Sequence, residues 1–272
     1  MESIKELREK LQREKLEGRE RPWGYRLFQR GPSIYITRVL LVTPLTPNTA
    51  SLLSILFGMS GAFLLLCPDW RIKLAALFLF YLNLLFDRVD GELARYKRIF
   101  SLKGIYFDEI NHYLIPPLFF LSFAWGLKDG TIHHESLILL AGMWAGFASI
   151  FLRLTHNIHY SIFLKKYTKH RDILPLPEIS AGVGELRAHH SLLYVILKPF
   201  HQFQDFFLTL VLFAGAFVLE RLFAPNAFLF PYTAVLLFAY AVYLPLIVLE
   251  NMVKRAITIE NKMRELAEIQ QS

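Results

Sequence analysis

Only one cysteine, Cys67, occurs among the 272 residues, so no disulfide can form within the chain. Charged side chains are scarce, at 19% of the sequence, and we find no internal repeat or low-complexity segment. Gly182-Val-Gly184 lacks the Lys and Ser or Thr of a phosphate-binding loop. The first 30 residues lack the apolar core of a secretory signal, which predicts that later segments direct membrane insertion.

Long hydrophobic segments dominate instead, and hydrophobic residues make up 54% of the chain. A helix needs about 20 mostly apolar residues to cross a bilayer. Six segments approach that length, near residues 49–67, 72–87, 105–125, 136–155, 205–223 and 231–251. The sequence therefore predicts an all-α integral membrane protein with a six-transmembrane-helix bundle, whose membrane domain covers residues 35–252.

The positive charges follow a membrane pattern. The net charge is +7, and 26 of the 30 Lys and Arg residues lie in alternate connections, including both chain ends and the loop after the second segment. Because cytoplasmic loops are enriched in Lys and Arg, both termini and that loop are predicted to be cytoplasmic. The excess charge suits anionic membrane lipids and does not indicate a nucleic-acid partner.

The two ends of the chain have helical patterns. In the N-terminal arm, residues 1–34, Ile4, Leu7 and Leu11 recur at helical spacing, which predicts an amphipathic helix over 3–16 on the membrane or on the protein. A charged arm with little fixed structure is the alternative. Trp23, Tyr25 and Phe28 are typical of interfacial anchors. Residues 253–272 predict a cytoplasmic C-terminal helix.

A cluster of acidic and small residues follows the second segment. Its pattern is D-x2-D-G-x2-A-R-x8-G-x3-D, and its fixed positions are Asp87, Asp90, Gly91, Ala94, Arg95, Gly104 and Asp108. If the second helix continues through Arg95, its motif residues share one face, because residues three and four apart are neighbours. A third helix beginning near Leu102 would align Gly104, Asp108 and His112. The two faces are therefore predicted to meet in one cavity.

Converging carboxylates repel one another unless a cation joins them. Oxygen ligands without cysteine favour hard cations, so the motif predicts Mg²⁺ or Mn²⁺. Gly91, Ala94 and Gly104 would let a ligand approach the backbone closely, and Arg95 could bind a phosphate group. The alternatives are close helix packing for the glycines and an interfacial position for Arg95.

This pattern resembles the signature of the CDP-alcohol phosphotransferases, and Thr46-Pro47-Asn48 is similar to a tripeptide found upstream in many members. The resemblance implies a membrane enzyme, often a homodimer, that joins an alcohol or lipid acceptor to the phosphate of a CDP-alcohol and releases CMP. Asp87, Asp90 and Asp108 would bind the metal ions, with two ions expected. Gly91, Ala94, Arg95 and Gly104 would hold the nucleotide.

His112 stands where the family signature has a fourth Asp, the proposed general base. Three interpretations remain open. His112 is the base beside the catalytic Asp108, since an imidazole can take a proton near pH 7. Alternatively another group is the base, or the protein is a non-catalytic member that binds lipid or acts as a scaffold.

A group of basic residues follows the fourth segment. Among them, we predict that Arg153, Lys165 and Lys166 bind a phosphate on the acceptor. A positively charged loop is the alternative for them and for His156 and His159. The His156-x-x-His159 pair lacks a Glu and is weak as a metal motif. An ion-coupled transporter is a further class, although no inverted repeat is visible.

Overall fold

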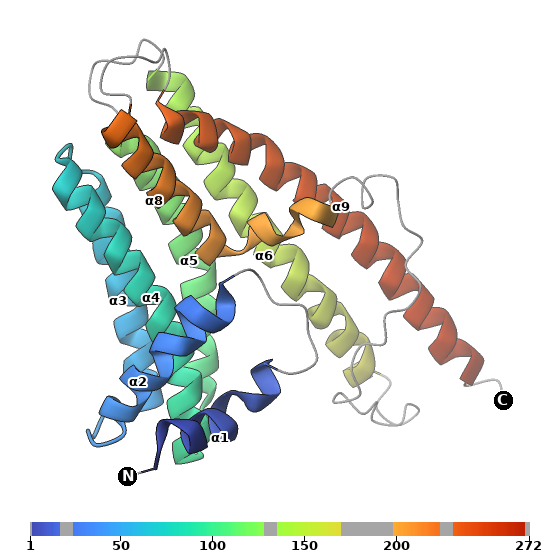
Figure 1. The fold of residues 1–272 in the computed structure, drawn as a ribbon. Coiled ribbons are helices and arrows are strands. Elements are labelled where there is room, and N and C mark those ends of the chain that lie inside the picture. The colour runs from blue at the N-terminus through green and yellow to red at the C-terminus, as the bar shows by residue number, and fades with distance from the viewer. Residues whose placement is uncertain (1, 17–23, 128–134, 170–197, 224–230, 270–272) are drawn as a thin grey trace.

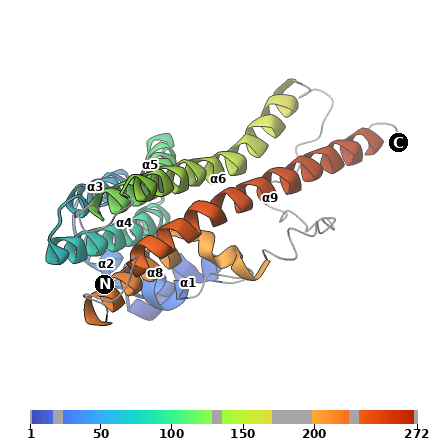
Figure 2. The same ribbon diagram turned by 90° about the horizontal axis from the view of Figure 1, so that it is seen from above.

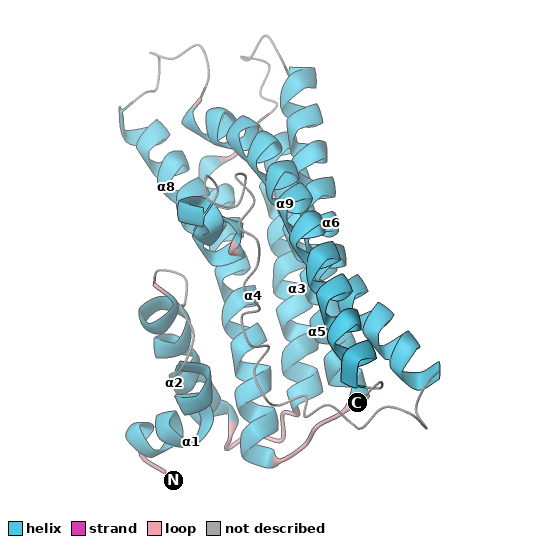
Figure 3. Ribbon diagram, turned by 90° about the vertical axis from the view of Figure 1, so that its right-hand side faces the viewer, coloured by secondary structure: helices cyan, strands magenta, loops and turns pink. Residues whose placement is uncertain are grey.

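The computed structural model describes residues 2–16, 24–127, 135–169, 198–223 and 231–269, and gives the backbone alone for 14–16, 159–160, 162–169, 198–199 and 258–269. Every regular element in this part of the chain is a helix (Figure 1), and no strand is present there (Figure 3). The prediction of an all-α protein is confirmed.

Four helices are long and apolar enough to cross a membrane: α3 (Pro47–Leu65), α8 (Phe206–Phe223) and the apolar parts of α6 (Glu135–Lys169) and α9 (Tyr232–Ile269). The other two predicted spans are α4 (Trp70–Lys97) and α5 (Leu102–Gly126), of 28 and 25 residues. They are long enough, but they carry the charged and polar residues of the motif, so they do not reach the same apolar character.

Local signals explain where these helices begin and end. Thr46 accepts a hydrogen bond from the Thr49 N–H at 3.2 Å, and Pro47 occupies the first turn of α3. Ser101 caps α5 in the same way through the Gly104 N–H at 3.0 Å. Arg98 ends α4 in the left-handed conformation, with φ of 54°. The predictions that the second helix continues through Arg95 and that the third begins near Leu102 are confirmed.

The helices pack in a sequence of pairs. α3 packs against α4 and α5, α5 packs against α6, and α6 runs beside α9 (Figure 2). Aromatic rings fill the centre, with centroid distances of 5.2 Å for Phe119–Phe213 and 4.8 Å for Phe123–Phe213. A Cβ at Gly126 would collide with the Leu65 carbonyl, so glycine is what allows α5 to approach α3 there.

The N-terminal segment packs beside one end of α4 (Figures 1 and 3). It comprises α1 (Ile4–Leu16), the π-helical turn η1 (Tyr25–Arg30) and α2 (Gly31–Leu40). Ser3 and Glu6 cap α1 reciprocally, and the Ser3 N–H holds the pKa of the Glu6 carboxyl below its usual range. A helix is therefore present over most of the range predicted for one, residues 3–16.

The apolar face of α1 is buried against the protein. Leu7 and Leu11 pack with Ile34 of α2 in one small core. Tyr25 is also buried, so its prediction as an interfacial anchor was wrong, and Trp23 lies outside the described residues. At the other end of the chain, residues 253–269 continue α9 without a break, so no separate C-terminal helix begins at 253.

Candidate active site

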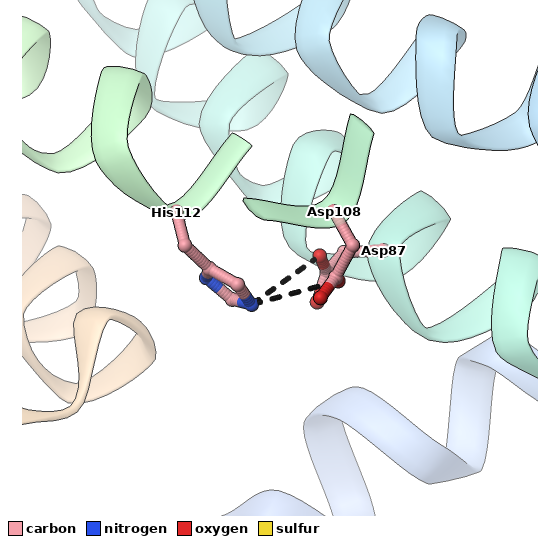
Figure 4. A group of neighbouring side chains, drawn as sticks. All are labelled: Asp87, Asp108 and His112. Atoms are coloured by element: carbon pink, nitrogen blue, oxygen red, sulfur yellow. Dashed lines mark ion pairs between the residues drawn. The ribbon is translucent and has the colours of Figure 1, made fainter. Parts of the chain in front are cut away.

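Two neighbouring helices bring two carboxylates and an imidazole together. Asp87 lies on α4, and Asp108 and His112 lie one turn apart on α5 (Figure 4). One ligand atom from each residue falls within a span of 4.8 Å. The His112 Nε2 atom is 3.9 Å from Asp87 Oδ1 and 3.6 Å from Asp108 Oδ1. This spacing suits a shared cation.

Asp87 is the buried member of this triad, with a side chain that is 3% exposed. Asn111 Nδ2 donates to Asp87 Oδ1 at 3.1 Å, and Arg88 Nη1 lies 3.2 Å from Asp87 Oδ2. Asn83 Nδ2 in turn donates to Asn111 Oδ1 at 2.7 Å. The Asp108 and His112 side chains are 43% and 34% exposed, so the triad is closed on the α4 side and open on the α5 side.

A cavity of about 630 Å³ lies on one side of the triad, and we call it cavity A. The structure brings seven sequence-predicted residues to its wall, namely Asp87, Asp90, Gly91, Ala94, Arg95, Gly104 and Asp108. Asn48, Ser51 and Arg30 also line it. The motif residues therefore share one wall, as their helical spacing predicted.

His112 faces a second cavity of about 390 Å³, which we call cavity B. Asp87 and Arg88 line both cavities, whereas Asp108 lines only cavity A and His112 only cavity B. The prediction of one cavity for all these groups was therefore wrong. The two cavities adjoin at Asp87 and Arg88 of α4, which line both.

Asp90 stands apart from the triad in cavity A. Its Oδ2 atom accepts a hydrogen bond of 2.5 Å from Ser51 Oγ on α3. Gly104 provides a close approach between α5 and α3, because a Cβ there would lie 3.0 Å from Asn48 Oδ1. Asn48 Oδ1 also accepts from Ser101 Oγ at 2.7 Å. The tripeptide at the start of α3 thus fixes the start of α5 beside the cavity.

Basic side chains lie around cavity B. Arg153 Nη2 donates to Glu109 Oε1 at 2.8 Å, and Asn157 Nδ2 donates to Glu109 Oε2 at 2.7 Å. Arg255 of α9 contacts His156 Nδ1 at 2.6 Å. Arg153 lies within helix α6, so the alternative of a positively charged loop does not apply to it. Lys165 and Lys166 lie further along α6, and their side chains, like that of His159, are outside the described part.

Sequence reasoning missed a buried polar cluster behind cavity A, centred on Glu92. Glu92 Oε1 accepts from Arg30 Nη1 at 2.9 Å, Gln12 Nε2 at 2.8 Å and Ser33 Oγ at 2.8 Å, and Oε2 accepts from Thr37 Oγ1 at 2.7 Å. These partners come from α1, η1 and α2. The only sequence signal was a charged residue on the face of α4 opposite the predicted site.

Removing Glu92 is expected to destabilise the fold. Glu92→Ala leaves the buried Arg30 guanidinium without its counter-charge, which costs about 3–5 kcal/mol of unfolding free energy. Denaturant unfolding of the purified protein measures this, with the exposed Glu9→Ala of α1 as the control. An effect no larger than that of Glu9→Ala would contradict the structural importance of the cluster.

Residues 44–181 match the sequence profile of the CDP-alcohol phosphatidyltransferase family. This stretch covers half of the chain and includes the whole motif. The chain belongs to this family. It is therefore a membrane transferase of the CDP-alcohol phosphotransferase type, whose apolar helices agree with an integral membrane protein.

The fold of this family member is similar to that of a solved structure. The apo phosphatidylinositol phosphate synthase of Mycobacterium tuberculosis is 18% identical and superposes with a TM-score of 0.51. The match covers 83% of this chain and 94% of that one, which shows a shared fold. No curated protein sequence matches the chain significantly.

Proposed function

We propose that the protein transfers a substituted phosphate from a CDP-alcohol to the hydroxyl of an acceptor and releases CMP, in the synthesis of a phospholipid or related phosphodiester. The observation that carries this proposal is the arrangement of the two cavities. Seven motif residues line cavity A, and cavity A meets cavity B at Asp87. A donor in one cavity and an acceptor in the other would meet at the carboxylates.

Cavity A is the donor site of this proposal. Its volume of about 630 Å³ lies within the ~300–1,000 Å³ usual for small-molecule sites. Arg30 and Arg95 line it together with Asp87, Asp90 and Asp108, so a diphosphate would lie between guanidinium and carboxylate groups. Gly91, Ala94 and Gly104 have small side chains or none, so a nucleotide could lie close to the backbone of this wall.

Asp87, Asp90 and Asp108 are the residues proposed to hold Mg²⁺ or Mn²⁺, with two ions as the expected number. Asp87 and Asp108 fit this role, because each has a carboxylate oxygen in the group of ligand atoms within 4.8 Å, and hard cations prefer such oxygens. Asp90 is included by its place in the motif and on the wall of cavity A. Bound there, such cations would neutralise the diphosphate and the negative charge that develops on the leaving CMP.

His112 is proposed to act as the base from cavity B. Its Nε2 atom points toward the carboxylates and can take the proton of an acceptor hydroxyl that lies between the two cavities. The acceptor oxygen then forms its bond to the phosphorus that carries the first alcohol. The bond from that phosphorus to the CMP oxygen breaks, and CMP leaves.

The position of Arg153 supports the proposal that the acceptor itself carries a phosphate. The residue lines cavity B beside Arg255, and the name of the mycobacterial structural neighbour refers to a phosphorylated product. Lys165 and Lys166 remain part of the proposed acceptor site by their position on α6 alone. A lipid alcohol is the alternative acceptor.

Arg153→Gln is expected to raise the KM for a phosphorylated acceptor by about 10–100-fold, because one charge-assisted hydrogen bond to the phosphate is lost. Initial rates at varied acceptor concentration measure this. Glu109→Gln is the matched control, since it weakens the same ion pair but leaves Arg153 in the cavity. Equal KM values for Arg153→Gln and Glu109→Gln would contradict the proposal that Arg153 binds the phosphate of the acceptor.

The proposal includes the membrane arrangement. It counts α4 and α5 as membrane spans in addition to the four apolar helices. The distribution of Lys and Arg supports a cytoplasmic position for the motif and both termini. Homodimerisation rests on the family resemblance. A non-catalytic scaffold and an ion-coupled transporter are not favoured, because the family is one of transferases and the site carboxylates gather at one place.

A donor panel tests the function. Purified protein is incubated with Mg²⁺, individual CDP-alcohols and both phosphorylated and lipid acceptors, and CMP is quantified by chromatography. CMP that requires one donor and one acceptor supports the proposal and identifies both substrates. Absence of CMP with every pair, in protein that still binds CDP, would instead indicate a non-catalytic member.

A further inference from the structure

The N-terminal helix α1 is bound to the motif helix α4 through a buried amide. Gln12 is 1% exposed, and its Nε2 atom donates to Glu92 Oε1 at 2.8 Å and to the Arg30 carbonyl at 2.9 Å. The residues that meet here are 80 positions apart in the chain. A buried donor of this kind is costly to leave unpaired, so Gln12 fixes the position of α1 on the protein.

The contact falls on the part of α4 that lines cavity A. Glu92 lies between Gly91 and Ala94, and three residues before Arg95. Leu7 and Leu11 fix the other side of α1 through the small core with Ile34. The helix is thus held on two sides, by a polar contact and by an apolar one.

Arg95 lines cavity A and also contacts α1 directly. Its Nε atom donates to the Leu11 carbonyl of α1 at 3.0 Å. Because the guanidinium is planar, one bond at Nε fixes the direction of the two terminal nitrogens. Nη1 lies over Gly91, 3.3 Å from where a Cβ would be, and Nη2 is buried with no hydrogen-bond partner in the described part of the chain.

Arg95 has no carboxylate among the hydrogen-bond acceptors found for it in the described part of the chain. Arg30 and Arg95 both line cavity A, but Glu92 forms its ion pair with Arg30. The Arg95 guanidinium therefore has a backbone carbonyl as its protein acceptor and donors left for a ligand. A diphosphate in cavity A would supply acceptor oxygens to those donors.

We propose that α1 is a positioning element for the donor site, in which Gln12 and the Leu11 carbonyl hold Arg95 so that it binds the diphosphate of the nucleotide. This inference rests on the proposed donor function of cavity A. Loss of α1 docking then weakens nucleotide binding and leaves the acceptor site in cavity B unchanged.

The test uses the full-length protein, Mg²⁺ and CDP as the probe, with calorimetric binding and steady-state kinetics. Gln12→Glu places a second carboxylate beside Glu92, and Leu7→Ala loosens α1 from its apolar side. Each is expected to weaken CDP binding and raise the donor KM by about 10-fold, while the acceptor KM stays constant. Arg8→Gln is the control, because it makes the same charge change as Gln12→Glu at an exposed position of α1.

A double-mutant comparison separates positioning from general loosening of the fold. In an Arg95→Ala background, Gln12→Glu is expected to cause no further loss of CDP binding. The inference is overturned if Gln12→Glu and Leu7→Ala bind CDP like Arg8→Gln, or if the loss persists in full without Arg95. Absence of metal-dependent CDP binding by the unmodified protein would overturn the proposed donor function itself, and this inference with it.

Discussion

Asp87→Asn is expected to lower metal-dependent CMP formation by at least ~10³-fold, because several kcal/mol of charge stabilisation in the transition state depend on this carboxylate. Asp87 lines both cavities, and its two oxygens face His112, Asn111 and Arg88. The amide keeps the size of the side chain but removes its charge. The measurement is the rate of CMP release at saturating donor and Mg²⁺, together with Mn²⁺ binding followed by electron paramagnetic resonance.

The control for this change lies on the same helix. Asp69 caps α4 by accepting from the Arg71 N–H at 2.7 Å, and Asn is an equally good cap. Asp69→Asn should therefore retain the CMP release rate and Mn²⁺ binding. If Asp87→Asn retained the rate as well, Asp87 would not be a metal ligand, and the division of donor and acceptor at this residue would have to be abandoned.

His112→Ala is expected to lower kcat by about 10²–10⁴-fold, the usual contribution of a general base. The donor KM should change little, since His112 lines cavity B and not cavity A. His112→Asp restores the acid found at this position in the family signature, so it is expected to preserve the rate or raise it. Single-turnover rates with saturating donor and acceptor measure both changes.

Outcomes at His112 separate the three interpretations of this position. His201→Asn is the control, because this histidine of η2 (Lys198–Gln204) lines neither cavity. A normal rate in His112→Ala would show that another group is the base. A rate that only His112→Asp displays, with none in the unmodified protein, would show that the histidine marks lost activity.

Local sequence signals predicted the parts of the fold that local chemistry controls. The start of a helix near Leu102 and the helical spacing of Asp87, Asp90 and Gly91 depend on residues within one or two turns. They were sufficient to place the motif on two helix faces that line a common cavity. The apolar lengths likewise indicated the four helices that are long and apolar enough to cross a membrane.

Contacts between distant segments could not be predicted in this way. Nothing local to Gln12 indicates that its amide meets Glu92, and this contact helps to hold α1 behind cavity A, together with the core of Leu7, Leu11 and Ile34. The split into two cavities has the same origin, since Arg153 of α6 and Arg255 of α9 line cavity B together with His112. Hydrophobic spacing reports which face of a helix is buried, but not which helix covers it.

Transfer of the donor's phosphate is the central claim, and a labelled donor tests it most directly. The unmodified protein is given a CDP-alcohol with radioactive phosphorus next to its alcohol, the acceptor identified by the panel, and Mg²⁺. We expect the label to appear in a phosphodiester of the acceptor, with one CMP per product, and both to disappear when EDTA removes the metal. CMP formed without label in the acceptor, or transfer that continues in excess EDTA, would contradict the account.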